Sequence, residues 1–131
     1  MTAPRTLFDK LWDAHAVTTR EDGQTLLWID RHFVHEGSHH AFAKLREKGA
    51  QVSRPELTFG VADHYAPTRT RDLAAIDPGI ADMVRRLQAN CAAQGVRLYG
   101  LDDPRQGIVH VLGPEQGLTL PGLTMVCGDS H

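Results

Sequence analysis

Apolar positions along the chain follow two periods, and together they predict helices and short strands in alternation. Helical spacing predicts three helices: one capped by Thr6 that runs to about residue 16, one capped by Ser38 and ended by Gly49, and one opened by Pro78 and Gly79 and ended by Gly95. Short apolar runs predict strands over 26–30, 57–62, 96–99, 108–112 and 123–126. The side chains expected in the core include Leu7, Leu11, Trp12, Trp28, Phe42 and Leu45.

Strands that alternate with helices favour parallel connections, in which each helix crosses one face of the sheet. We therefore expect an α/β fold, with a layered sheet of mostly parallel strands and flanking helices. Residues 108–131 include no predicted helix, so this part of the sheet is expected to be mixed. No repeat or linker divides the chain, and residues 1–131 are interpreted as a single domain that is cut off before its active site is complete.

Composition narrows the class of protein. The 131 residues are 41% hydrophobic and 23% charged, which is the balance of a globular domain and not of a disordered or fibrous chain. A formal net charge of -2, with lysine and arginine scattered, argues against nucleic acid as a partner. The apolar runs are short and the N-terminus lacks the apolar stretch of a secretory signal, so no membrane partner is expected and the cytoplasm is the predicted location.

Chemically active side chains lie in or just after three of the predicted strands. Asp63 and His64 follow the strand over 57–62, His110 interrupts the one over 108–112, and the group Asp129, Ser130 and His131 follows the one over 123–126. The carboxyl ends of parallel strands share one edge of a sheet, which is where open α/β sheets bind ligands. The sequence therefore predicts that these residues meet and form one wall of an active site.

The Asp63-His64 pair could perform acid-base chemistry, because a neighbouring carboxylate raises the pKa of an imidazole above its ordinary value of ~6.5. Asp63 could equally cap a turn and leave His64 in solvent, and His110 could be a core histidine bonded to a backbone carbonyl. The sequence pattern leaves these readings open. A serine hydrolase is not indicated by Asp129, Ser130 and His131, because the G-x-S-x-G nucleophile elbow is absent.

Three other features suggest chemistry less strongly. The histidines at 32, 35, 39 and 40 could bind a divalent metal, but Gly37 and Ser38 favour a solvated loop and a helix start between 35 and 39. Residues 113–117 are interpreted as a turn, whose backbone amides could approach a substrate carboxylate. Cys91 and Cys127 lack CxxC spacing, so neither a disulfide scaffold nor a self-contained zinc or iron–sulfur site is predicted.

With these segments placed, the chain resembles the aconitase family of iron–sulfur hydro-lyases, and within it the N-terminal part of the large subunits of isopropylmalate dehydratases. The resemblance extends over essentially the whole chain. It is carried by residues 6–11, by 29–32 with His35 and Glu36, by Asp63-His64, and above all by the long run from 106–110 through 113–117 to 127–131.

This resemblance implies interconversion of 2-isopropylmalate and 3-isopropylmalate through an enzyme-bound alkene, a step of leucine biosynthesis. It implies that His64, paired with Asp63, is the acid that protonates the departing hydroxyl. His110 and His131 are implied to line the pocket for hydroxyl and carboxylate, Asp129 to hydrogen-bond the oxygen held at the cofactor, and Ser130 to orient a substrate carboxylate. The implied cofactor of the complete enzyme is a [4Fe-4S] cluster.

The family pattern also includes parts that this sequence lacks. The cysteine ligands of the cluster belong to a later segment, so no metal ligand is assigned here, and the proton-abstracting serine belongs to a separate small subunit, which is an expected partner together with the remaining large-subunit domains. We expect the chain alone to have no dehydratase activity, to bind no cluster and to self-associate through exposed apolar surface. Another hydro-lyase acting on a branched malate, such as citramalate or dimethylmalate, and a non-catalytic binding or assembly module remain alternatives.

Overall fold

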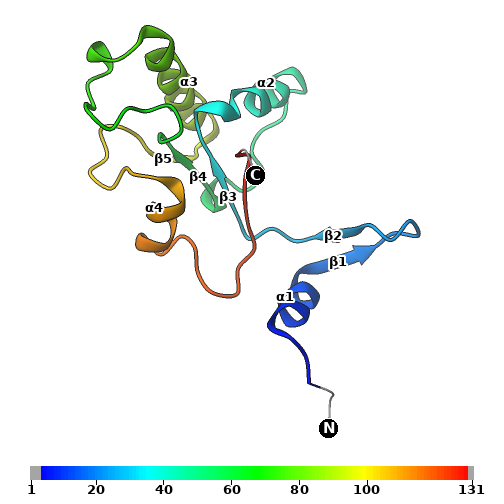
Figure 1. Ribbon diagram of the computed structural model, residues 1–131. Coiled ribbons are helices and arrows are strands. Elements are labelled where there is room, and N and C mark those ends of the chain that lie inside the picture. Colours follow the sequence, from blue (N-terminus) through cyan, green and yellow to red (C-terminus); the bar gives the residue numbers. More distant parts are fainter. Residues whose placement is uncertain (1–3, 130–131) are drawn as a thin grey trace.

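The computed structural model describes residues 4–129, and within this range a four-stranded sheet lies between helices (Figure 1). The strand order is β5-β4-β3-β6, and each neighbouring pair in this sheet is parallel. The strands are β3 (Arg31–Val34), β4 (Thr58–Val61), β5 (Arg97–Tyr99) and β6 (Met125–Cys127). The predicted α/β class is confirmed. The expectation of a mixed portion is wrong for this sheet, because β6 runs parallel to β3.

Helices cover both faces of the sheet and close a separate core on each. On one face, α2 (His39–Glu47) and α3 (Pro78–Gln94) pack over a core that contains Val34, Phe42, Ala62, Val84, Leu87, Cys91, Val96 and Leu101. On the other face, α4 (Val109–Glu115) covers Phe33, Phe59, Val61, Tyr99, Val109, Leu112 and Leu118. Phe33 and Val34 are neighbours in β3 but enter different cores, because successive side chains of a strand point to opposite faces.

The best-predicted element is α3, because its ends are marked by residues with specific backbone roles. The Asp77 carboxylate accepts hydrogen bonds from the backbone N–H groups of Gly79 and Ile80, at 2.8 and 3.1 Å, and Pro78 occupies the first helical turn. At the other end Gly95 adopts the left-handed conformation, with φ of 67°, that commonly ends helices. The predicted bounds of this helix are confirmed, as are those of α2 to within a residue or two.

The predicted strand over 108–112 is wrong, because this segment forms the start of α4. Its apolar residues satisfy a helical period as well as an alternating one: Val109 and Leu112 are one turn apart and are buried, while Val111 is exposed. The helix also includes residues 113–115, which were interpreted as part of a turn. Gly113 lets the helix approach the sheet, since an added Cβ would lie 3.2 Å from Phe33 Cζ.

The predicted strand over 26–30 is also misplaced. A hairpin of β1 (Ala16–Thr19) and β2 (Thr25–Leu27) ends before residue 28. One of the two inner strands of the main sheet is β3, for which no strand was predicted. Only Phe33 and Val34 of β3 are apolar and buried, so its hydrophobic run is too short to stand out. The strand predicted over 57–62 is confirmed as β4 and the one over 96–99 as β5, while the last one begins two residues later than predicted and ends one residue later. Short 3-10 helices occur at Glu36–Ser38, Pro55–Leu57 and Leu73–Ala75.

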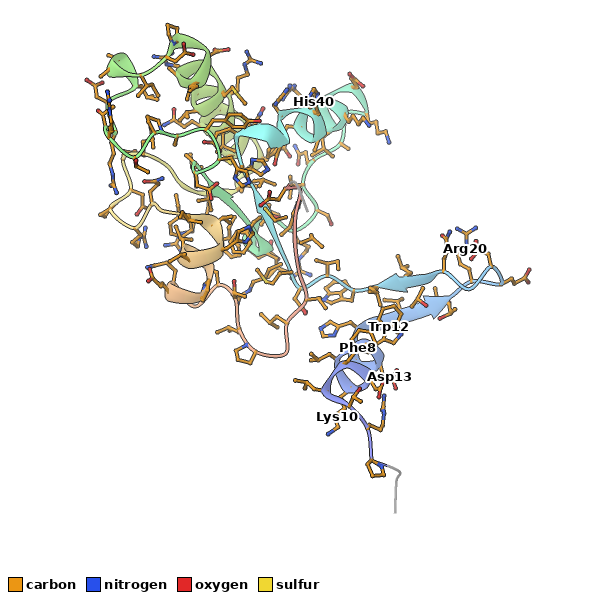
Figure 2. The ribbon with its side chains drawn as sticks, viewed as in Figure 1. Phe8, Lys10, Trp12, Asp13, Arg20 and His40 are labelled. Atoms are coloured by element: carbon orange, nitrogen blue, oxygen red, sulfur yellow. The ribbon has the colours of Figure 1, made fainter. Side chains whose placement is uncertain are left out.

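The first helix and the hairpin form an arm that extends away from the sheet (Figure 1). The arm begins with α1 (Leu7–His15), which Thr6 caps as predicted. Phe8 and Trp12 stack on this helix with ring centroids 5.8 Å apart, and both are exposed (Figure 2). Leu7 and Trp28 are exposed as well, so the expectation that they and Trp12 enter the core is wrong. Self-association through this apolar arm stays a prediction. Within residues 4–129, no helix is long and apolar enough to cross a membrane.

His15 ties the arm to the body of the molecule. Its Nδ1 lies 2.7 Å from the carbonyl oxygen of Leu11 and its Nε2 lies 2.7 Å from Asp30 Oδ2, while that same carboxylate accepts the backbone N–H of Thr124 at 2.8 Å. Both neighbours of the ring are acceptors, so both ring nitrogens must donate and the ring is an imidazolium. The Leu11 carbonyl, more than the Asp30 carboxylate, raises the pKa of His15 above 6.5, although burial opposes the charge.

We expect the arm to detach as the pH rises through the pKa of His15. A pKa that is higher in the folded than in the unfolded state gives stabilisation that is complete below the unfolded value of ~6.5 and is lost as the pH climbs past the folded value. The fluorescence of Trp28, whose Nε1 donates to Asp30 Oδ1, should report this change as the pH rises from below ~6.5 past the raised pKa of His15. A His15→Gln variant should show a flat profile over this range, and a pH-dependent profile in that variant would contradict the assignment.

Candidate active site

The carboxyl ends of β3, β4 and β6 gather their polar residues at one edge of the sheet. His35 and Glu36 follow β3, Asp63 and His64 follow β4, and Asp129 follows β6. The predicted meeting of these segments is confirmed for Asp63, His64, His110 and Asp129. Ser130 and His131 lie outside the described residues, and their predicted places in the site stay predictions.

The imidazole of His64 lies between two carboxylates that come from different strands. Its Nδ1 is 2.6 Å from Asp63 Oδ1 and its Nε2 is 3.1 Å from Asp129 Oδ2. The side chains of Asp63 and Asp129 are only 6% and 9% exposed, so water screens this contact weakly. Burial disfavours the charged imidazole, but the hydrogen bonds to Asp63 and then Asp129 outweigh it and raise the pKa of His64 above 6.5. His64 therefore holds its proton to a higher pH than an unperturbed histidine would.

Asp63 has a second structural role, because its other oxygen accepts the backbone N–H of Val109 at 2.6 Å. This bond caps the N-terminus of α4, which fixes both the carboxylate and the helix. The two readings left open by the sequence are thus both realised: Asp63 is a cap and also the partner of His64. The His64 side chain is 22% exposed and is not simply in solvent.

His110 reaches the site from α4 and not from a strand. Its Nε2 lies 3.0 Å from Asp129 Oδ2, so the Asp129 carboxylate joins His64 and His110. The side chain of His110 is 53% exposed, which excludes the reading of a core histidine. A small hollow of about 200 Å³ opens beside this pair and is lined by His110, Met125, Val126, Cys127 and Asp129.

The histidine group of the sequence analysis divides in space. His35 is buried and stacks on His64 with ring centroids 3.7 Å apart, whereas His39 and His40 pack on each other on α2. His35 Nδ1 accepts the backbone N–H of Gly37 at 3.2 Å, so its Nε2, 2.9 Å from the Gly128 carbonyl, must carry the proton. His35 is therefore the neutral Nε2–H tautomer. The reading of the whole group as solvated is wrong for His35, which forms one wall of the site.

Glu36 is the site residue that the sequence analysis did not single out. It is 1% exposed, and its carboxylate faces the backbone N–H groups of Asp63, His64 and Tyr65 at 3.2 to 3.3 Å. The available signal was weak: a charged residue two positions after the apolar pair Phe33-Val34, since buried glutamates occur almost only with partners. Nitrogen and oxygen atoms of His35, Glu36 and His64 lie within 4.8 Å of one another.

The two cysteines do not form a cluster site. Cys91 lies on α3 and is fully buried in the core, where burial raises the pKa of its thiol to about 12. At the site edge, burial followed by the charges of Asp129 and Asp63 raises the pKa of Cys127 to about 11. Iron–sulfur clusters require several cysteine thiolates at one place. The two cysteines present therefore do not fit together as ligands of such a cluster.

Comparison with known proteins identifies the family to which the chain belongs. The model of the aconitase family (aconitate hydratase) matches residues 9–131, which includes every site segment named above. The chain belongs to the aconitase family. It is 54% identical over 127 residues to the 3-isopropylmalate dehydratase large subunit of Bacteroides fragilis. That alignment covers 96% of this chain but 27% of the relative, so the chain spans about a quarter of the length of the protein it matches. The resemblance inferred from the sequence is confirmed.

Proposed function

We propose that this aconitase-family chain is the N-terminal part of a 3-isopropylmalate dehydratase large subunit, and that residues 1–131 form part of its first domain. The observation that carries the proposal is the imidazole of His64, held between Asp63 and Asp129 at the carboxyl edge of the sheet. The 54% identity to a protein of that name supports the choice of substrate. The complete enzyme would interconvert 2-isopropylmalate and 3-isopropylmalate in leucine biosynthesis, with the cytoplasm as its compartment.

His64 acts as the general acid in this proposal. Dehydration removes a proton from one carbon and a hydroxyl from the next, and the hydroxyl leaves as water once a proton reaches its oxygen. Asp63 holds the Nδ1–H of His64 in place, so the mobile proton is the Nε2–H, which faces Asp129 and the His110 side. After transfer, the neutral ring keeps its Nδ1–H bond to Asp63 and can take back a proton in the reverse, hydration direction.

The neighbouring residues orient the substrate around His64. Asp129 accepts a hydrogen bond from the substrate oxygen, His110 lines the pocket for hydroxyl and carboxylate, and His131 and Ser130 complete it. A [4Fe-4S] cluster belongs to the complete enzyme in this proposal, with cysteine ligands from sequence outside this chain. The small subunit and the remaining large-subunit domains are the proposed partners, and the small subunit supplies the base that removes the carbon-bound proton.

A chimeric large subunit tests this proposal. The chain replaces the equivalent segment of the Bacteroides fragilis large subunit, and the product is combined with the matching small subunit and loaded anaerobically with its cluster. We expect conversion of 3-isopropylmalate to isopropylmaleate, followed by the ultraviolet absorbance of the alkene, and faster turnover with isopropylmalate than with citramalate. The isolated chain should show no turnover, because one positioned acid contributes only ~10²- to 10⁴-fold. A folded, cluster-loaded chimera without turnover would refute the proposal.

A further inference from the structure

Glu36 has a buried carboxylate, and its hydrogen bonds to residues 4–129 go to the loop that bears His64. Oε2 of Glu36 faces the backbone N–H groups of Asp63 and His64 at 3.3 and 3.2 Å, and Oε1 faces that of Tyr65 at 3.3 Å. Three consecutive N–H groups directed at one carboxylate form an anion-binding concavity, here filled by a side chain of the same protein. A glutamate with 1% exposure is costly to bury unless such partners satisfy it.

We propose that Glu36 is a positioning residue for the proton-transfer pair, which it holds by clamping the backbone of the 63–65 loop. This inference rests on the proposed function, since it assigns Glu36 a role in the chemistry of His64. The clamp explains how a loop directly after β4 holds two side chains in place at once. Asp63 must meet both His64 Nδ1 and the Val109 N–H at 2.6 Å, and a small rotation of its backbone would break one of these contacts.

The groups that contact His64 come from several elements, so the backbone of the 63–65 loop must be held in place for the ring to meet all of them. Asp63 and Asp129 contact the two ring nitrogens, His35 stacks on the ring face, and His110 shares the Asp129 carboxylate. The Nδ1 of His35 accepts from Gly37, so the neutral His35 adds no positive charge beside His64. The imidazolium is therefore stabilised by the two aspartates, and each contact depends on where the loop places the ring.

Substitution Glu36→Gln tests the clamp, because glutamine has the same size but presents an amide NH₂ where a carboxylate oxygen had accepted an N–H. We expect the pKa of His64, followed by the nitrogen and carbon NMR signals of its ring, to fall toward 6.5 as its contacts with Asp63 and Asp129 loosen. The matched control is Glu47→Gln, the same change at an exposed position of α2, which should leave the His64 titration unchanged. An unchanged His64 titration in a folded Glu36→Gln chain would overturn the proposal.

A measurement on the unaltered chain covers the case in which Glu36→Gln does not fold. The backbone amides of Asp63, His64 and Tyr65 should exchange with solvent far more slowly than those of the exposed loop at Arg69. Fast exchange at all three would overturn the clamp. In the chimeric enzyme, Glu36→Gln should lower kcat at least tenfold with little change in KM. A lowered His64 pKa with undiminished kcat would support the clamp and instead refute His64 as the catalytic acid.

Discussion

Replacement of His64 by glutamine in the chimeric dehydratase is expected to lower kcat by about 10²- to 10⁴-fold, the range that a positioned general acid contributes. Glutamine can still donate a hydrogen bond toward Asp129, but it has no proton that it can transfer at neutral pH. The substrate pocket keeps its other polar groups, so KM should change much less than kcat. The measurement is the initial rate of isopropylmaleate formation from 3-isopropylmalate at saturating substrate.

The dependence of kcat on pH distinguishes loss of the general acid from a general loss of enzyme structure in the His64→Gln variant. The raised pKa of His64 means that its proton is present below the usual 6.5 and persists above it, so the dehydration rate should fall as the pH climbs through that raised value. In the His64→Gln variant this decrease in rate at high pH should be absent. The control is His40→Gln, the same substitution on the exposed surface of α2, for which kcat and profile should match the parent (Figure 2). A parent-like rate in a folded His64→Gln enzyme would remove His64 from the mechanism.

Much of the fold could be predicted because local signals and tertiary packing agree. The ends of α3 are set by Asp77, Pro78 and Gly95, whose effects act within a turn of the backbone and can be read without knowledge of the fold. The strand β4 is buried over its whole length, which gives a run of apolar residues that only a covered sheet explains. Alternation of such elements leaves few arrangements other than a parallel sheet between helices.

The two main errors of prediction concern β3 and α4, where contacts with residues distant in sequence determine the secondary structure. The apolar stretch of β3 is two residues long, and this segment becomes a strand because β4 and β6 pair with it on both sides. Residues 108–112 satisfy both periods, and the helix is selected by a cap from Asp63, which is far away in sequence. The local sequence pattern identifies neither the strands that pair with β3 nor the carboxylate that caps α4. The exposed arm is a similar case, because its apolar residues have the spacing expected of a core-facing element although several of them are exposed.

The location of the site could be predicted from the sequence better than the role of each residue in it. Parallel strands put Asp63, His64 and Asp129 at one edge whatever the details of the loops, so their meeting follows from the topology. His110 lies at the same point although its element was predicted wrongly, because α4 begins at the carboxyl edge, where Asp63 caps it. Glu36 was missed because its role depends on backbone N–H groups of another segment, and its position two residues after Phe33-Val34 does not identify those donors.

Substitution Gly60→Ala is expected to destabilise the fold by about 1–3 kcal/mol, the usual cost of forcing extra atoms into a packed core. Gly60 lies in the middle of β4, where an added Cβ would be 2.7 Å from Cys91 Sγ and 3.0 Å from Leu98 Cδ1. Cys91 is completely buried, so it cannot move aside without displacing α3 from the sheet. Urea unfolding followed by circular dichroism should show the loss as a lower midpoint with an unchanged slope.

A matched control exists at Gly107, where the same substitution would place a Cβ with nothing within 4 Å and no left-handed backbone is required. Gly107→Ala should leave the midpoint within the small range typical of surface changes. If crowding against the sulfur is the cause, removing that sulfur should relieve it: Gly60→Ala combined with Cys91→Ala should be less destabilised than the sum of the single variants. Strict additivity of the two free-energy changes would show that α3 does not approach β4 as closely as in the structure. The packing that anchors β4, the strand that leads to Asp63 and His64, would then have to be reconsidered.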